Sequence, residues 1–224
     1  QNQQRFCNCF SFQLYVSSQG KQDRIRCEME CDIMVNVKTY HCFPTLIHEF
    51  KGYQDANSHM NMLNVIEFEN KGGDLHQHPA FRDFSQRVLE CNKHILDTDK
   101  YQYENVEITN MWGNTLSRGD DHPPHTHSNN ILSGVYYLQA SEEASPIQFF
   151  DPRPQASTFK PRNQPNWNNS NMVNFNPVVG IGLIFPSWLM HWVPPTKVER
   201  VSISWNVIVR GDYGEPNTLQ NAHI

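Results

Sequence analysis

Apolar and polar residues follow two different periods along the chain, and the period changes near Glu104. Before that point, apolar residues recur every three or four positions in two segments, which indicates amphipathic helices. The first segment runs from about Ser58 to Glu69, and the second from about Pro79 to Leu96. An aromatic and β-branched run, Phe43–Phe50, precedes them and predicts a strand near a sheet edge, because it contains a proline.

After Glu104 the chain consists of short apolar runs separated by clusters of Gly, Pro and Asn. The predicted strands cover residues 105–113, 131–139, 147–151, 181–186, 189–193 and 200–210. Many short strands at such spacing are typical of a β-sandwich or barrel, so we expect a mainly β (α+β) protein braced by the N-terminal helices. The connection over 152–177 is long for a compact domain, which favours a lid or a binding loop.

Composition places few limits on function. The chain has 224 residues, enough for one full core, with 18 Lys and Arg against 23 Asp and Glu and a formal net charge of −5. No basic tract stands out, so nucleic acid is not an expected partner. No apolar run has the roughly 20 residues of a membrane-spanning helix. We therefore expect a soluble cytoplasmic protein with no membrane partner.

The N-terminal segment differs from the rest of the chain. Four of the six cysteines fall within the first 31 residues, as C-x-C and C-x3-C pairs that are either free thiols or a zinc site of unusual spacing. We expect residues 1–33 to be a poorly ordered or non-native extension and 34–224 to be a single domain. Within that domain, 34–103 would form a helical support and 104–212 the β core.

The segment Gly119–Leu138 carries the densest set of potential metal ligands, Asp120, Asp121, His122, His125 and His127. Side chains alternate faces along a strand, so His125 and His127 point the same way if the backbone is extended there. Together they would grip a metal from one side. A third ligand must come from elsewhere in the chain.

His191 is the candidate for that third ligand. The apolar strand Ile181–Phe185 meets Pro186, and the chain then returns to present His191. In a double-stranded β-helix, such a turn brings a late histidine opposite an early H-x-H pair. Neutral imidazole suits iron, zinc, copper and nickel, so the ligand type alone does not choose the metal.

The last predicted strand has one apolar face and one polar face. Its apolar face is Val201, Ile203, Trp205, Val207 and Val209, and its polar face begins with Arg200 and Ser202. An ordinary strand with a solvated face gives this pattern. So does a carboxylate site, because guanidinium binds a carboxylate through two parallel hydrogen bonds.

These motifs resemble one family. HTHSNNILSGVYYL, FFDPRP and IGLIFPSWLMHWVPP followed by RVSISWN are similar to the 2-oxoglutarate/Fe(II)-dependent oxygenases, and more closely to a family of them found in marine bacteria and phages. The resemblance covers about Val106 to Arg210. It implies a double-stranded β-helix (jelly-roll) core, Fe(II), 2-oxoglutarate as cosubstrate, and O2.

The resemblance also implies roles for single residues. His125 and His191 match the two metal histidines, and Arg200 with Ser202 matches the pair that binds the distal (C5) carboxylate of 2-oxoglutarate. Tyr137 matches a position that often donates a hydroxyl to the same carboxylate. At His127 the wider superfamily has Asp or Glu, whereas the closer family commonly has histidine.

The implied reaction couples decarboxylation of 2-oxoglutarate to succinate with oxidation of a substrate C–H bond. A neutral third imidazole offsets none of the metal charge, so this site would be more cationic than one with a carboxylate ligand. Asp120 or Asp121 could instead supply that carboxylate. Asp151 and Arg153, at the start of the 152–177 connection, are candidates for substrate contact or are parts of an ordinary Asp-Pro turn.

Two other classes of protein remain open. A cupin would bind metal without 2-oxoglutarate, and Gly119 with H-T-H and Gly180 with His191 fit the frame of its two motifs. The glutamate expected after H-x-H is absent, however. A non-catalytic jelly-roll binding module would suit the aromatic and Asn-rich loops, but it would have no need of His125, His191 and Arg200 together.

Overall fold

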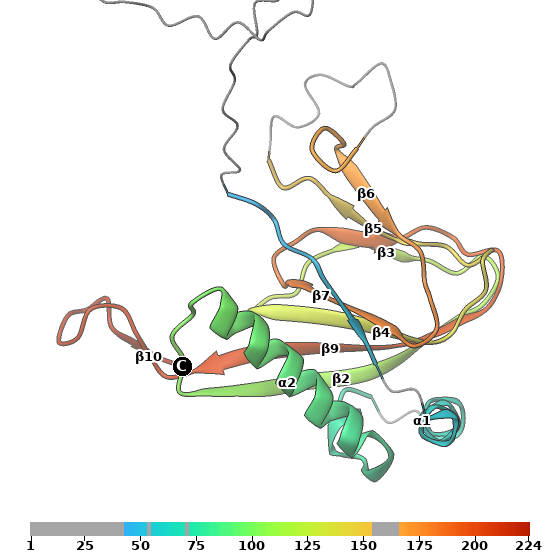
Figure 1. The fold of residues 1–224 in the computed structure, drawn as a ribbon, viewed down its shortest axis with the longest axis horizontal. Coiled ribbons are helices and arrows are strands. Elements are labelled where there is room, and N and C mark those ends of the chain that lie inside the picture. The colour runs from blue at the N-terminus through green and yellow to red at the C-terminus, as the bar shows by residue number, and fades with distance from the viewer. Residues whose placement is uncertain (1–42, 53–54, 70–71, 154–165) are drawn as a thin grey trace, which may run out of the picture. The chain divides into compact units, whose positions relative to one another are not determined.

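The structure is a computed structural model that describes residues 43–224 apart from 53–54, 70–71 and 154–165. The core of the described residues is a pair of antiparallel sheets, with two helices against the larger one (Figure 1). The predicted extension over 1–33, with its cysteine pairs, lies outside the described residues. Among the described residues, neither helix combines the length and the hydrophobicity needed to cross a bilayer.

The larger sheet has five strands in the order β1-β7-β4-β9-β2. Every neighbouring pair is antiparallel, and β2 and β9 make the longest ladder, interrupted by one bulge between Ile108 and Asn110. The strands are β1 (His48–Lys51), β2 (Asn105–Leu116), β4 (Leu132–Gln139), β7 (Ile181–Pro186) and β9 (Arg200–Arg210).

The smaller sheet has four strands in the order β3-β8-β5-β6, again all antiparallel. They are β3 (His122–His125), β5 (Ile147–Phe150), β6 (Met172–Phe175) and β8 (His191–Val193). A separate pair, β10 (Asp212–Tyr213) and β11 (Ala222–His223), follows the core. Two facing antiparallel sheets with few helices confirm the predicted mainly β, jelly-roll class.

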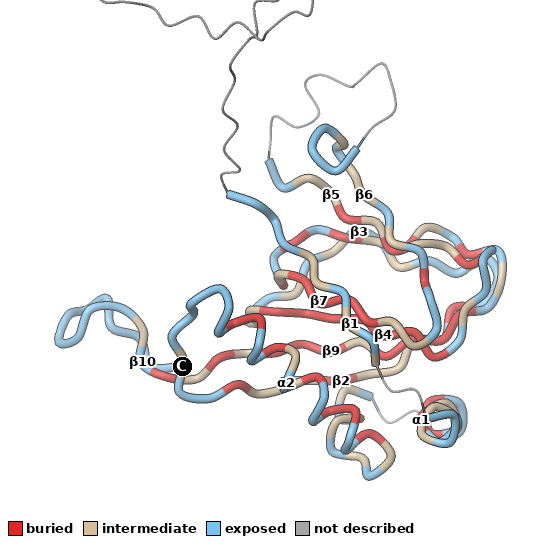
Figure 2. The backbone as a smooth tube through the Cα atoms, viewed as in Figure 1, coloured by how far each residue is buried: buried red, intermediate tan, exposed pale blue. Residues whose placement is uncertain are grey.

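The larger sheet is buried on both faces because its strands alternate between two cores (Figure 2). One core lies under the helices and contains Tyr136 and Trp205. The other lies between the sheets and contains Val135 and Tyr137. The helices are α1 (Ala56–Phe68) and α2 (Arg82–Thr98), with short 3₁₀ turns at Leu75–Gln77 and Pro79–Phe81. Asp55 caps α1 by accepting hydrogen bonds from the backbone of Asn57 and Ser58.

The observed elements follow the predicted ones with local differences. The strand expected over Phe43–Phe50 starts only at His48, since Phe43 has a positive φ of 56° and is fully exposed. The predicted 152–177 connection contains a strand, β6, which was missed because its four residues lack a clear alternation of apolar and polar positions. The part of that connection at 154–165 lies outside the described residues.

Candidate metal centre and cosubstrate pocket

A bulge in β3 sets the direction of its histidines. In the β3–β8 ladder, His122 pairs with Val193 and His125 pairs with His191, so three steps on β3 match two on β8. The extra residue falls in Pro123-Pro124, where proline has no amide hydrogen to lose from a ladder. His122 and His125 therefore face the same side, which a regular strand would not allow at this spacing.

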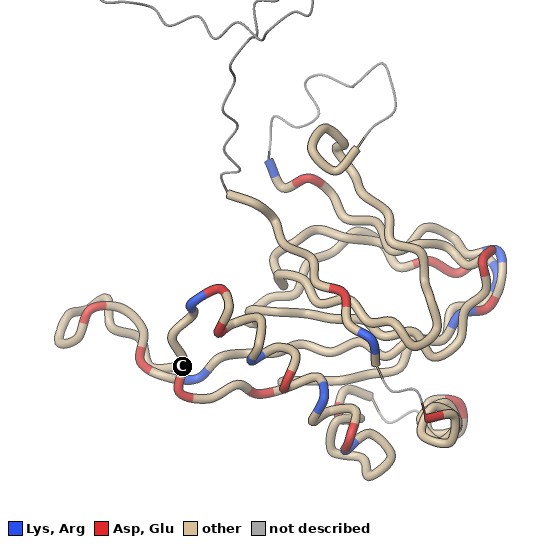
Figure 3. Tube along the Cα trace, in the orientation of Figure 1, with Lys and Arg blue, Asp and Glu red and all other residues tan. Residues whose placement is uncertain are grey.

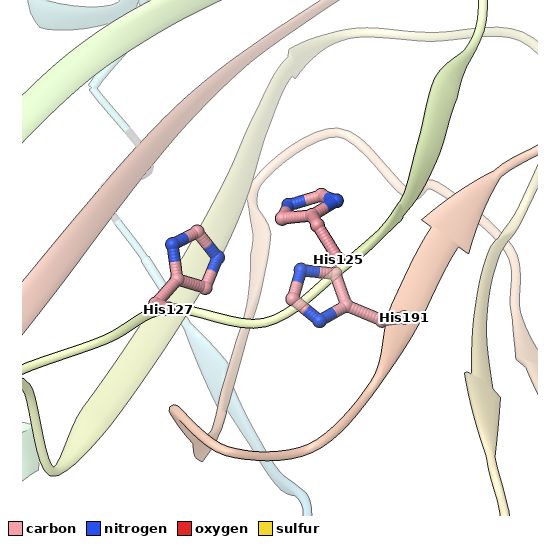
Figure 4. A group of neighbouring side chains, drawn as sticks. All are labelled: His125, His127 and His191. Atoms are coloured by element: carbon pink, nitrogen blue, oxygen red, sulfur yellow. The ribbon is translucent and has the colours of Figure 1, made fainter.

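His125, His127 and His191 come together between the two sheets, each offering a ring nitrogen within 4.8 Å of the others (Figure 4). The centroids of the His125 and His191 rings are 4.4 Å apart, and the His127 ring is 5.1 and 5.2 Å from them. β3 ends at His125, so His127 lies just beyond the strand. Its backbone N–H donates to the carbonyl of Ser187 at 2.9 Å.

Two of the three rings are oriented by backbone carbonyls. His125 Nδ1 lies 2.7 Å from the carbonyl oxygen of Pro123, and His191 Nδ1 lies 2.8 Å from that of Leu189. A carbonyl can only accept, so each Nδ1 carries the hydrogen. The Nε2 atoms then keep their lone pairs for a metal, and this is the arrangement that usually orients metal-binding histidines.

Burial keeps two of the rings neutral. Desolvation lowers the pKa of His191 to about 4, and the neighbouring His125 and His127 act in the same direction. Desolvation also lowers the pKa of His127 to about 4, again helped by His125. At neutral pH both imidazoles are therefore uncharged, which is the form that binds a metal.

The polar face of β9 is not solvated. Arg200, Ser202 and Asn206 are each less than 5 % exposed and face the space between the sheets, opposite the apolar face that packs under the helices. The Arg200 guanidinium lies 5.0 Å from the centre of the Tyr137 ring, and its Nη1 donates to the carbonyl of Ser145 at 2.7 Å. A buried arginine on an inner wall is the feature expected of an anion site.

Two buried polar atoms beside Arg200 have no hydrogen-bond partner among the described residues. They are its own Nε and the hydroxyl oxygen of Tyr137. Burial raises the pKa of Tyr137, while the charge of Arg200 and the contact of its guanidinium with the hydroxyl act in the opposite direction, so the phenol keeps its proton and can donate. Buried donors of this kind are costly unless a partner arrives. A carboxylate placed here would satisfy both.

The histidines and Arg200 line one cavity of about 210 Å³. Its wall also includes Trp112, Asn114 and Ser204, which no sequence motif singles out, and His122, one of the potential metal ligands of the segment Gly119–Leu138. The Trp112 indole donates to the Asn114 side-chain oxygen at 3.1 Å, and Asn114 donates to the Ser204 hydroxyl at 2.9 Å. Strand alternation on β2 and β9 puts Trp112, Asn114 and Ser204 on the same inner face as Ser202, and this was the available signal.

The remaining acidic candidates lie apart from the cluster of histidines. Asp120 accepts a hydrogen bond from the backbone of Ser117 at 2.9 Å, and neither it nor Asp121 belongs to the group of possible metal ligands in the described structure. Asp151 is paired with Arg153 at 2.5 Å, and neither residue lines the cavity. Among the described residues, Arg200 is the one arginine, lysine or carboxylate side chain in the wall. Acidic and basic residues are otherwise interspersed along the described chain (Figure 3).

The donor set fits a single metal ion with open coordination positions. Three imidazoles on one side leave the other side free for a cosubstrate and for oxygen. A buried arginine with an unpaired donor then fits a dianionic cosubstrate at the far end of the same cavity. Such a donor set inside a jelly roll suits a metal-dependent enzyme.

Residues 110–206 match the sequence profile of the family described as "Putative 2OG-Fe(II) oxygenase". This segment contains every metal-binding and cosubstrate-binding residue predicted above. Over these 97 of 224 residues the chain resembles the 2OG-Fe(II) oxygenases, for which Fe(II) and 2-oxoglutarate are the implied cofactors.

Solved structures with the same fold include several 2-oxoglutarate enzymes. A prolyl-4-hydroxylase from Pseudomonas putida is 14 % identical with a TM-score of 0.55, covering 75 % of this chain and 89 % of its own. The viral collagen prolyl hydroxylase of Paramecium bursaria Chlorella virus-1, in complex with 2-oxoglutarate, is 12 % identical with a TM-score of 0.50, covering 74 % and 96 %.

HygX from Streptomyces hygroscopicus, with nickel and 2-oxoglutarate bound, is 10 % identical with a TM-score of 0.50, covering 74 % and 82 %. At these identities the likeness concerns the fold. No protein in a search of curated sequences matches the chain.

Proposed function

We propose that this protein is a 2-oxoglutarate- and Fe(II)-dependent dioxygenase that oxidises a C–H bond of its primary substrate. In the hydroxylase form of the reaction, R–H, 2-oxoglutarate and O2 give R–OH, succinate and CO2. One atom of the O2 molecule enters R–OH and the other enters succinate. The single observation that carries the proposal is the shared cavity. It has three histidines that can bind one metal and a buried arginine with an unpaired donor.

His125, His127 and His191 would hold the iron through ring nitrogens. Bound Fe(II) would supply the redox chemistry that activates O2 as 2-oxoglutarate is decarboxylated. The protein's part is to keep His127 and His191 neutral through burial and to orient His125 and His191 through the carbonyls of Pro123 and Leu189.

Arg200, Ser202 and Tyr137 would bind the distal carboxylate of 2-oxoglutarate. Arg200 offers Nε and the fork beside it, and the two hydroxyls can each donate one hydrogen bond. Because Ser145 already holds one end of the guanidinium, the fork is fixed before the cosubstrate arrives. The distal carboxylate would then direct the 2-oxoacid end of the molecule toward the histidines.

Asp151 and Arg153 remain our candidates for contact with the primary substrate. Asp151 follows Phe149, the register partner of His191, by two residues, so the pair begins close in sequence to the strand that carries a metal ligand. The Arg153 side chain is largely exposed and can exchange its partner Asp151 for an anionic group of a substrate.

The test is cosubstrate turnover. Purified protein with Fe(II), 2-oxoglutarate and O2 should form succinate, and His191→Ala should abolish this, whereas the exposed His94→Ala should not. If the protein binds metal but neither binds 2-oxoglutarate in a metal-dependent way nor forms succinate, a cupin would be favoured. Binding of neither metal nor 2-oxoglutarate would favour a non-catalytic module.

A further inference from the structure

His127 differs from the other two histidines in what fixes its direction. The rings of His125 and His191 each have a backbone carbonyl beside Nδ1. In the described structure, no hydrogen bond fixes the ring of His127, and its position depends on its backbone. That backbone has one hydrogen bond to the opposite segment, from His127 N–H to the Ser187 carbonyl at 2.9 Å.

Ser187 lies where the two histidine-bearing segments meet. Besides accepting from His127, it donates its own N–H to the carbonyl of Ile131 at 3.0 Å. In the other direction, a turn closed by the Leu189 N–H and the Pro186 carbonyl, at 2.9 Å, leads to His191. A shift of Ser187 would therefore move His127 relative to His191.

The side chain of Ser187 is tied to the larger sheet by a buried row of hydrogen bonds. Its hydroxyl lies 2.8 Å from that of Ser133 on β4, which lies 2.6 Å from the Asn206 side-chain oxygen on β9. The Asn206 amide nitrogen donates to Asn110 on β2 at 2.9 Å. Ser187, Ser133 and Asn206 are 0, 1 and 4 % exposed.

The hydrogens in this row run in one direction. The Asn206 oxygen can only accept, so Ser133 must donate to it. A hydroxyl has one hydrogen, so Ser133 has none left for Ser187, and Ser187 must be the donor in their contact. Each member of an ordered row of this kind polarises the next, which stiffens the whole.

We infer that Ser187, anchored through Ser133 and Asn206, is a positioning residue that sets His127 at the distance from His191 needed to share one metal ion. The inference rests on the proposed function. It gives the third imidazole, which has no orienting carbonyl, a support of its own. It also predicts that Ser133→Ala weakens Fe(II) binding more than Ser187→Ala does, because Ser133→Ala breaks two hydrogen bonds of the row and Ser187→Ala breaks one.

The test measures metal affinity rather than turnover. Anaerobic Fe(II) titration against a competing chelator should show about a 10-fold weaker affinity for Ser187→Ala, at the lower end of the range for outer-shell substitutions. The Fe(II) affinity of Ser133→Ala should be lower still. Ser85→Ala, which removes a buried hydroxyl from α2 away from the site, should leave the affinity unchanged. If Ser187→Ala does not fold, Ser187→Cys keeps the side-chain size with a weak donor.

A double-mutant comparison separates positioning from general damage. If Ser187 acts through His127, Ser187→Ala should weaken Fe(II) binding less than 2-fold in a His127→Ala background, while keeping most of its effect in a His94→Ala background. An equal effect in both backgrounds, or wild-type affinity for Ser187→Ala, would overturn the inference. Wild-type affinity for His127→Ala and His191→Ala would instead reject the proposed ligand set.

Discussion

Arg200 is the residue whose surroundings most clearly require a partner. It is buried, its Nη1 is held by the Ser145 carbonyl, and its Nε has no partner among the described residues. Arg200→Ala should therefore weaken 2-oxoglutarate binding by at least about 2 kcal/mol, which is roughly 30-fold in Kd.

Calorimetric titration of 2-oxoglutarate into metal-loaded protein measures this loss. Arg82→Ala is the matched control, since it removes an exposed arginine that does not line the cavity. Both variants should keep wild-type Fe(II) affinity. Unchanged 2-oxoglutarate affinity in Arg200→Ala would remove the basis of the cosubstrate site.

His127 raises a different question, because an imidazole stands where the wider superfamily has a carboxylate. We expect His127→Ala to weaken Fe(II) binding by more than about 10-fold, since even outer-shell substitutions cost about 10- to 100-fold. His127→Asp should retain binding, because a carboxylate oxygen is also a ligand and offsets metal charge. Fe(II) titration of both variants measures these affinities. If both variants bind Fe(II) as tightly as the wild type, His127 is not a ligand.

The histidines and Arg200 could be assigned to one site from the sequence, because their spacing and their alternation along the strands are visible in the chain. The row from Ser187 to Asn110 could not be predicted from the sequence. Serine and asparagine carry no distinctive pattern, and their contacts join segments up to 96 residues apart.

Single elements place the site through small departures from regularity. The bulge at Pro123-Pro124 turns both His122 and His125 inward, and alternation on β9 directs Arg200 and Ser202 to the same cavity. Periodicity predicts alternation well, since it is a property of every strand. A bulge depends on the partner strand, and for this reason the inward direction of His122 was not predictable.

Strand β4 packs so closely against Trp205 and Leu183 that there is no room for a side chain at Gly134. A Cβ there would lie well inside the van der Waals radius of the buried Trp205 ring and 2.9 Å from the Leu183 carbonyl oxygen. Gly134→Ala should therefore lower the free energy of unfolding by about 1–3 kcal/mol.

Urea denaturation measures that cost. Gly73→Ala is the matched control, because its new methyl group would meet only Asn110 Cβ, at an ordinary 3.5 Å. Equal stability of the two variants would contradict the described packing of β4 against Trp205.

In the described part of the molecule, the proposed site depends on the sheets bringing distant segments together. β3, the residues just after it and β8 supply the three histidines, and β4 and β9 supply Tyr137, Arg200 and Ser202. The mainly β class and the jelly roll followed from strand spacing and from family motifs. Strand order in the two sheets did not, because pairing is a long-range property.

The central claim is that the metal and 2-oxoglutarate bind in one cavity and contact each other. Anaerobic calorimetric titration of 2-oxoglutarate, with and without Fe(II), tests it most directly, since ligands that share a site change each other's affinity equally. Fe(II) should strengthen 2-oxoglutarate binding at least about 5-fold, the lower end of usual coupling, and His191→Ala should remove the difference. Identical 2-oxoglutarate affinity with and without Fe(II) would contradict the account.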